Sequence, residues 1–154
     1  MIQVPPDLIR PLFNEKLERG RLFRLADYPL LSGRKAKYLV VLNVNREASS
    51  IYHALTTSQV ARYQALRFGE YGVLMKASSA VSLPLDTIID CFSLPDPLER
   101  EYLFVEFCRG NLKALEVLPS EAMQSIDVLL VKSPRIAPAT KREIIPGYGG
   151  TVTQ

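Results

Sequence analysis

The stretch KYLVVLNVNREASSIYHALTTSQ, residues 37–59, decides the fold. It begins with an apolar run, Tyr38 to Leu42 together with Val44, that is rich in β-branched residues, and a second run, 51–55, follows after a polar break at 45–50. Runs of this length and composition predict two neighbouring strands joined by a polar loop. The second strand ends in three hydroxyl side chains, 56–58, and this end of the strand is therefore a candidate place for chemistry.

The chain as a whole has the composition of an ordinary soluble globular domain. Its 154 residues are 47% hydrophobic and 23% charged, which is enough to build one buried core. Apolar runs stay well short of the roughly 20 residues that a membrane helix needs, and the start of the chain lacks the pattern of a signal peptide. We therefore expect a cytoplasmic protein without a membrane partner. The formal charge of +3 permits nucleic-acid binding without requiring it.

The sequence offers no pattern for a metal or a cofactor. Cys91 and Cys108 lie too far apart for a metal-binding motif, and we expect them to be buried free thiols. The chain has one histidine, and it lacks a glycine-rich phosphate loop or a nucleotide fingerprint. Asp86 and Asp90 lie four residues apart in a predicted strand and would share one face. They fit either a pair of catalytic carboxylates or ordinary strand-end capping.

The elements around the central stretch are predicted from periodicity and turn residues. We expect a helix within residues 1–20 that packs on the body of the domain, with the alternative that it begins only near Pro11, because proline disfavours a helix interior. Further along, the pattern predicts strands at 21–26, 71–76, 81–85, 86–92, 101–107 and 112–117, loops at 27–37 and 109–111, and helices at 58–68 (capped by Ser58) and 119–132.

Many short strands with turn-rich connections and one late helix predict a small, mainly β (α+β) fold, a strongly bent antiparallel barrel. In this interpretation residues 1–20 are an N-terminal helical extension, and residues 21–133 form the barrel domain. Residues 134–154 contain several Pro and Gly residues and are expected to be a flexible tail.

The order of several short motifs resembles the PemK/MazF family of toxins. Gly20-Arg21-Leu22-Phe23 matches the family's Gly-rich turn and first strand, and the strand at 37–42 matches its "RPALVLS"-like strand. His53-Ala54-Leu55-Thr56-Thr57-Ser58 matches the strand that ends in a Thr/Ser pair. The stretch 112–123 is similar to the closing strand and the "LSPEEM"-like helix start, and 81–86 to the strand ahead of it. The resemblance covers about residues 19–132.

This resemblance implies an SH3-like barrel, usually dimeric, that cleaves single-stranded RNA without a metal. The implied reaction is attack by a ribose 2′-hydroxyl on the neighbouring phosphate. The family's Thr/Ser pair falls on Thr56 and Thr57, and its Arg falls on Lys37. The lysine is a departure, because it offers a flexible point charge in place of a planar fork. The departure leaves three alternatives. Lys37 stabilises the transition state in place of the arginine, or Arg34 does so from the loop, or the activity has been lost.

The candidate site residues each have a structural alternative. The candidate catalytic residues are Lys37, Thr56 and Thr57, and the candidate RNA-binding residues are Arg34, Lys35, Ser58 and His53. The hydroxyl side chains also suit a strand end that caps a helix, and the basic residues also suit a solvated loop. A single histidine in an alternating strand is more often structural than catalytic, although its pKa suits proton transfer.

The resemblance thus predicts a toxin of a toxin–antitoxin pair, a homodimeric endoribonuclease that acts on single-stranded RNA. Its antitoxin is expected to lay an acidic, partly disordered segment across the basic groove and to fold on binding. The first alternative is an inactive SH3-like barrel that only binds nucleic acid or a protein. The second alternative is an unrelated small β domain.

Overall fold

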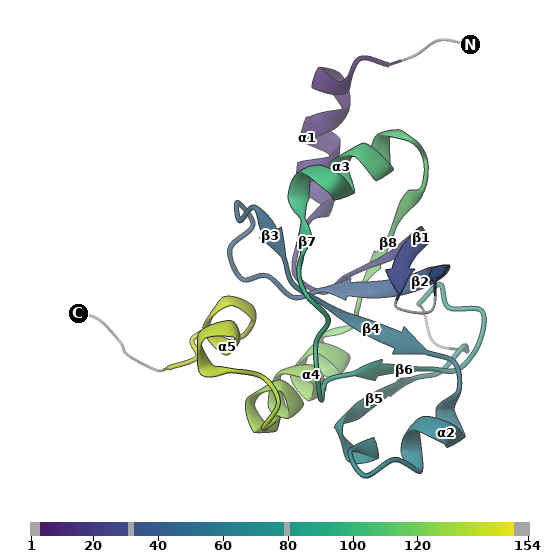
Figure 1. The fold of residues 1–154 in the computed structure, drawn as a ribbon, viewed down its shortest axis with the longest axis vertical. Coiled ribbons are helices and arrows are strands. Elements are labelled where there is room, and N and C mark those ends of the chain that lie inside the picture. Colours follow the sequence, from purple (N-terminus) through teal and green to yellow (C-terminus); the bar gives the residue numbers. More distant parts are fainter. Residues whose placement is uncertain (1–3, 31–32, 79–80, 150–154) are drawn as a thin grey trace.

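The centre of the molecule is a curled, six-stranded antiparallel sheet, seen in a computed structural model that describes residues 4–30, 33–78 and 81–149 (Figure 1). The strand order is β5-β6-β4-β2-β1-β8. The strands are β1 (Arg21–Leu30), β2 (Gly33–Val41), β4 (His53–Thr57), β5 (Gly72–Met75), β6 (Thr87–Asp90) and β8 (Leu112–Val117). A small second ladder pairs β3 (Ser50–Ile51) with β7 (Leu98–Glu99). The predicted small, mainly β barrel-type fold is confirmed, in the form of a half-barrel.

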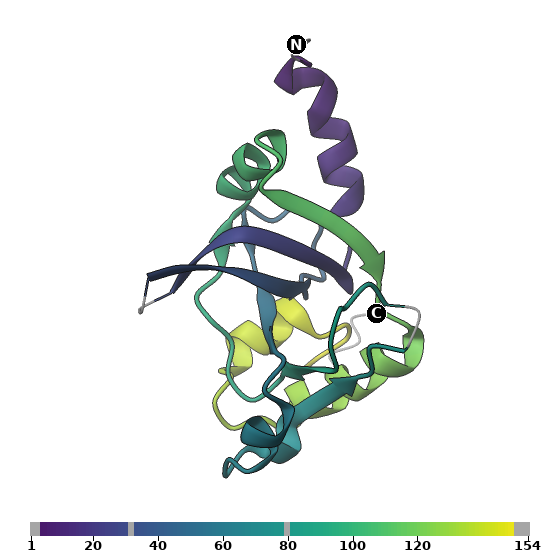
Figure 2. The ribbon, with the colours of Figure 1, turned by 90° about the vertical axis from the view of Figure 1, so that its right-hand side faces the viewer.

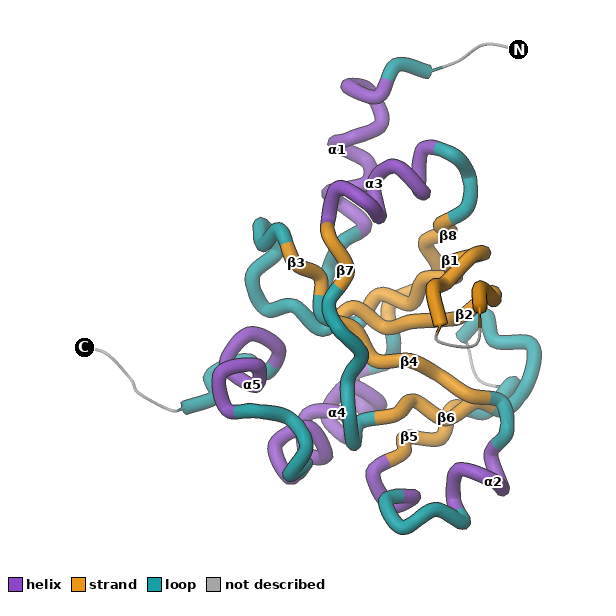
Figure 3. The backbone as a smooth tube through the Cα atoms, in the orientation of Figure 1, coloured by secondary structure: helices purple, strands orange, loops and turns teal. Residues whose placement is uncertain are grey.

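Helices cover both sides of this sheet (Figure 3). They are α1 (Pro6–Lys16), α2 (Val60–Gln64), α3 (Arg100–Cys108), α4 (Ser120–Lys132) and α5 (Pro138–Ile144), with a single 3₁₀ turn, η1 (Gly69–Tyr71). Helices α1 and α3 lie together on one side, whereas α4 and α5 lie on the other (Figures 1 and 2). Within the described residues, no helix is both long enough and apolar enough to cross a membrane.

The central strand β2 contributes to a separate hydrophobic cluster on each face of the sheet. Successive side chains of a strand point to opposite faces. Leu39 therefore packs toward α1 and α3, in a cluster with Phe13, whereas Val40 packs toward α4, in a cluster with Ile126. This double burial explains why residues 38–42 form a continuous apolar run in place of an alternating one.

The N-terminal helix packs on the body of the domain, as the sequence predicts. Phe13 is fully buried, and its ring centroid lies 5.4 Å from those of Phe104 and Phe107. The alternative start near Pro11 is wrong, because α1 begins at Pro6 and includes Pro11. Pro11 cannot donate a hydrogen bond to Asp7, but both residues are exposed, so water can satisfy the Asp7 carbonyl.

The predicted loop at 27–37 is wrong, because most of it forms a β-hairpin. The first two strands are paired as far as Leu30 and Gly33, including Tyr28 opposite Lys35. Gly33 has a φ of +121°, a backbone conformation that glycine adopts without strain. Pro29 lies within β1. The remainder of the turn, residues 31 and 32, lies outside the described residues.

Two further strand predictions are wrong. Residues 101–107 belong to helix α3, whose Leu103, Phe104 and Phe107 pack on α1 and β1 at helical spacing. Strand β8 consequently pairs with β1 and does not form a hairpin with residues 101–107. Residues 81–85 form no strand, although Leu83 is buried in the core.

The flexible tail predicted from residue 134 is also wrong over residues 134–149. Helix α5 packs into the core through Ile144, which is fully buried. Arg19 holds the end of this helix, because its Nε donates to the Ile144 carbonyl at 2.9 Å. Lys141 Nζ donates to the Val131 carbonyl at 2.6 Å and so ties α5 to the end of α4. Residues 150–154 lie outside the described residues.

Candidate functional site

The candidate site lies where strand β4 changes its partner. Residues 53–55 of β4 pair with β2, whereas Thr56 and Thr57 pair with β6. The strands β2 and β4 therefore separate beyond the Leu39–Leu55 pair. Side chains replace the missing ladder bonds: Lys37 Nζ donates to the Thr56 carbonyl at 3.2 Å, and Thr56 Oγ1 donates to the Tyr38 carbonyl at 3.0 Å.

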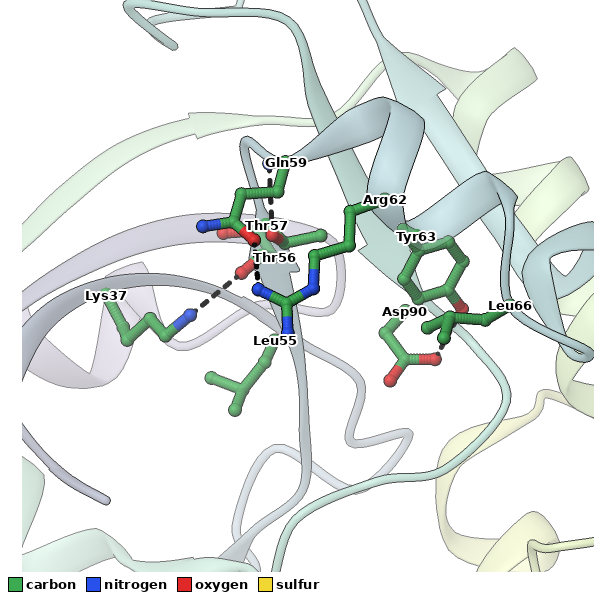
Figure 4. A pocket seen from close by; sticks show the side chains of 9 residues that line it. All are labelled: Lys37, Leu55, Thr56, Thr57, Gln59, Arg62, Tyr63, Leu66 and Asp90. Carbon is green, nitrogen blue, oxygen red and sulfur yellow. Dashed lines mark hydrogen bonds between the residues drawn. The ribbon is translucent and has the colours of Figure 1, made fainter. Parts of the chain in front are cut away.

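Two cavities open at this separation. The first, of about 290 Å³, is drawn in Figure 4 and is lined by Lys37, Leu55, Thr56, Thr57, Gln59, Arg62, Tyr63, Leu66 and Asp90. The second, of about 420 Å³, is lined by Lys35, Ala36, Lys37, Tyr38, Thr56, Thr57, Ser58, Gln59, Pro84, Leu85 and Thr87. Four residues line both, so the two cavities adjoin each other, and together they are called the β2–β4 cleft.

The structure places five of the seven candidate residues in the β2–β4 cleft. Lys37, Thr56 and Thr57 line both cavities, while Lys35 and Ser58 line the second. The two threonines differ in what they can do. Thr56 is buried and its proton is used on a backbone carbonyl. Thr57 Oγ1 accepts from the Gln59 amide at 3.1 Å, which leaves its own proton free to donate to a ligand.

The helix cap predicted at Ser58 is wrong. Helix α2 begins at Val60, its N-cap residue is Gln59, and no side chain caps it. Thr57 binds the Gln59 amide at this point instead. Ser58 is exposed and lies at the mouth of the second cavity.

Arg34 lies on the exposed part of the β1–β2 hairpin, away from both cavities. Its Nη1 donates to the carbonyl of Asp27 at 3.0 Å and to Asp27 Oδ2 at 3.1 Å. More than half of the Arg34 side chain is exposed. The guanidinium is thus occupied by a neighbouring carboxylate in this structure, whereas Lys37 faces the cleft.

His53 is fully buried and bonded to protein groups on both nitrogens. Its Nε2 lies 2.7 Å from the Tyr28 hydroxyl, and its Nδ1 lies 3.3 Å from the Ile51 carbonyl. These contacts fit a neutral ring that accepts from Tyr28 and donates to Ile51. Burial lowers the pKa of His53 to about 4 and raises the pKa of Tyr28 to about 12. The histidine therefore supports the packing of β4 against β1.

The first cavity is also lined by Arg62 and Tyr63, which the sequence reasoning did not select, and by Asp90. Arg62 extends from α2, and its Nη1 donates to Gln59 Oε1 at 3.2 Å (Figure 4). Asp90, at the end of β6, accepts from the Tyr63 hydroxyl at 2.7 Å and from the Phe92 amide at 2.9 Å. The position of Arg62, three residues after Gln59, is a usable signal, because a helix that follows a strand end returns its first turn toward that end.

The two aspartates considered as a carboxylate pair lie in different environments. Asp86 precedes β6, accepts from the Ala77 amide at 2.8 Å and lies 3.6 Å from Lys76 Nζ. These contacts lower the pKa of Asp86, the Ala77 amide most of all. Asp90 instead lines the first cavity and binds Tyr63. The contacts with the Ala77 amide and Lys76 thus explain the position of Asp86. Of the two aspartates, only Asp90 lines the first cavity.

The β2–β4 cleft is electropositive. Among the described residues, neither Lys37 nor Arg62 forms an ion pair with a carboxylate, and each donates only to a neutral oxygen. Burial, and then the charge of Lys35, lower the pKa of Lys37. Two cationic side chains without acidic partners, beside the free hydroxyl proton of Thr57, form a site that can bind an anion such as a phosphate.

Other candidate chemistry finds less support in the part of the chain that the structure describes. No group of three or more His, Cys, Asp or Glu side chains there is placed to hold a metal ion. Cys91 is buried, but the expectation of a second buried thiol is wrong, because Cys108 is exposed.

No protein-family model matches the chain, and no curated protein matches it. The resemblance to the PemK/MazF toxins therefore remains a prediction from the motifs.

Proposed function

We propose that this protein is a metal-independent endoribonuclease that cleaves single-stranded RNA in the β2–β4 cleft, as the toxin of a toxin–antitoxin pair. One observation carries the proposal: Lys37 and Arg62, neither of them paired with a carboxylate among the described residues, face one cavity together with the Thr57 hydroxyl. Cations and hydroxyl donors that converge in this way bind phosphate oxygens and stabilise the charge that builds on them during attack.

The nucleophile of the proposed reaction is the 2′-hydroxyl of the RNA itself. The 2′-oxygen forms a bond to the neighbouring phosphorus, and the bond from phosphorus to the 5′-oxygen of the next nucleotide breaks. The products are a 2′,3′-cyclic phosphate and a free 5′-hydroxyl. Lys37, in its amine form, takes the proton of the 2′-hydroxyl, faces the phosphate as an ammonium cation while charge builds there, and then gives the proton to the departing 5′-oxygen.

The lowered pKa of Lys37 is what suits it to this role, because a partly buried lysine holds more of the neutral amine at a given pH. Arg62 stays charged throughout and neutralises the phosphate, and Thr57 donates a hydrogen bond to one of its oxygens. The departure from arginine to lysine at position 37 is then compensated by the guanidinium of Arg62 from α2.

The second candidate function is a barrel that binds nucleic acid without cleaving it. Thr56 favours this alternative, since its buried hydroxyl is committed to the Tyr38 carbonyl and is not available to a phosphate. In that case the cleft would retain RNA through Lys35, Lys37 and Arg62, and binding would weaken steeply with salt.

The partners in this proposal are an antitoxin and a second copy of the chain. An acidic, partly disordered antitoxin segment suits the electropositive cleft, because it would pair Lys37 and Arg62 and exclude RNA. A homodimer is supported by Leu8 and Leu12, two apolar side chains that α1 leaves 70% and 49% exposed on one face. Light scattering of the wild-type protein and of Leu8→Glu tests the dimer.

The experiment is cleavage of an end-labelled single-stranded RNA in EDTA by the wild-type protein and by Lys37→Ala, Arg62→Ala and Thr57→Val. Exposed basic residues elsewhere supply the matched controls, Lys113→Ala for the lysine and Arg142→Ala for the arginine. We expect the controls to cut normally. Loss of the proton-transfer group in Lys37→Ala is expected to slow cleavage by about 10²–10⁴-fold.

The outcomes separate the candidates. Cutting that persists unchanged in both Lys37→Ala and Arg62→Ala would overturn the proposed site. A wild-type protein that retains RNA but does not cut it would establish the second candidate function. Normal cleavage by Lys113→Ala and Arg142→Ala would show that the loss of cleavage in the cleft variants is not caused by a general loss of positive charge.

A further inference from the structure

The first cavity of the β2–β4 cleft has two chemically different ends. Lys37 and Arg62 lie at one end, while Tyr63, Leu66 and Asp90 lie at the other (Figure 4). A phosphate suits only the cationic end, because a carboxylate repels it. The other end therefore requires a different part of the ligand.

The end around Asp90 has apolar walls. The Tyr63 ring is buried, and it is fixed by its hydroxyl bond to Asp90 and by an edge contact with Phe68 at 5.7 Å between centroids. Leu55 and Leu66 complete the walls, and Leu66 is 44% exposed although it is apolar. Apolar walls with a few fixed polar groups are the usual make-up of a pocket for a small ring.

Asp90 has one oxygen occupied and one available. Its Oδ1 accepts from both the Tyr63 hydroxyl and the Phe92 amide, so both lone pairs of that oxygen are used. Its Oδ2 has no bond or ion pair in the part of the chain that the structure describes. An ionised carboxylate oxygen only accepts hydrogen bonds, and a ligand at this position must therefore donate one.

We propose that this end of the cavity binds a nucleobase with an exocyclic amino group, which donates a hydrogen bond to Asp90 Oδ2. Adenine, cytosine and guanine carry such a group, whereas uracil presents carbonyl oxygens on either side of a single N–H. The cavity of about 290 Å³ has room for one base. The inference deepens the proposed function and rests on RNA being the ligand of the cleft.

The proposal is tested by fluorescence anisotropy with 2′-O-methyl oligonucleotides of adenosine, cytidine or uridine, which cannot be cut by 2′-oxygen attack. A hydrogen bond to a charged group is worth about tenfold or more in affinity. We expect the wild-type protein to bind the adenosine and cytidine probes at least about tenfold more tightly than the uridine probe.

Asp90→Asn makes the sharper prediction. The asparagine oxygen must keep accepting from Tyr63 and Phe92, and its NH₂ group then faces the cavity and donates. We expect the preference to reverse toward uridine. The matched control is Asp7→Asn, an exposed residue on α1, which should leave the preference unchanged.

A second variant covers the case in which Asp90→Asn does not fold. Leu66→Trp changes a partly exposed wall residue and fills the cavity, and it should abolish the preference for adenosine and cytidine. Equal binding of the three probes by the wild-type protein, or an unchanged preference in Leu66→Trp, would overturn the proposal. RNA cleavage without any base preference would overturn this inference alone, and base preference without cleavage would overturn only the ribonuclease.

Discussion

Substituting His53 with glutamine tests whether the buried histidine stays neutral in the folded protein. The ordinary pKa of histidine is 6.5, and burial lowers the pKa of His53 to about 4. The unfolded chain therefore binds a proton between these values while the folded protein does not. Stability is retained above pH 6.5 and is lost as the pH falls toward 4.

The size of this effect follows from the two pKa values. At pH 7 the ring is neutral in both states. At pH 4.5 the unfolded histidine is almost fully protonated and the folded one is mostly neutral, which costs about 2 kcal/mol of unfolding free energy. Glutamine does not titrate in this range, and its side-chain oxygen can accept from the Tyr28 hydroxyl.

The assay is urea unfolding followed by circular dichroism at pH 7 and pH 4.5, for the wild-type protein and for His53→Gln. The cost of the smaller glutamine side chain is independent of pH and cancels in the comparison. We expect the wild-type protein to lose about 2 kcal/mol more than the variant between the two pH values. An equal loss in both proteins would show that His53 is protonated in the folded state, and the neutral, buried ring would be refuted.

Three further predictions concern packing and the cleft. Phe13→Ala should lower the unfolding free energy by about 3–5 kcal/mol, because the ring is fully buried, whereas Glu15→Ala, at an exposed position of the same helix, should change it by less than about 0.5 kcal/mol; equal effects of the two variants in urea unfolding would show that α1 does not pack on the core. Gly72→Ala should lower the unfolding free energy by about 1–3 kcal/mol, because the added Cβ would lie 2.5 Å from Ile88 Cγ2 and 2.6 Å from Tyr63 Cε1. An unchanged unfolding free energy in the same assay would contradict this close approach. The cleavage rate should rise with pH and level off below pH 10.5, the ordinary pKa of lysine, because the reactive amine of Lys37 has a lowered pKa. A cleavage rate that falls as the pH rises toward 10.5 would exclude Lys37 as the base.

The centre of the fold and five of the candidate site residues follow from the sequence, for identifiable reasons. The run at 38–42 is apolar on both faces, and only a central strand buried on both sides satisfies it. The predicted second strand pairs with it over residues 53–55, as part of β4, and this pairing brings Thr57 to Lys37. The helix at 120–132 has one apolar face and a proline after its end, and it is confirmed as α4.

The remaining errors have physical causes. Residues 101–107 suit both an alternating strand and a helix, and the packing of Phe104 on Phe13 decides in favour of the helix. Pro29 and Gly33 are typical of loops, yet strand pairing accommodates both in a hairpin. Asp90 was not selected for the cleft because its position there depends on the change of partner by β4, a long-range event without a local signal.

The most direct test of the central claim compares an RNA with the DNA of the same sequence, both single-stranded, in the presence of EDTA. The DNA has the same phosphates but lacks the 2′-hydroxyl that the proposed reaction requires. We predict that the protein cuts only the RNA and that the products carry 2′,3′-cyclic phosphate and 5′-hydroxyl ends. Cleavage of the DNA, or RNA products with 5′-phosphate ends, would contradict the account.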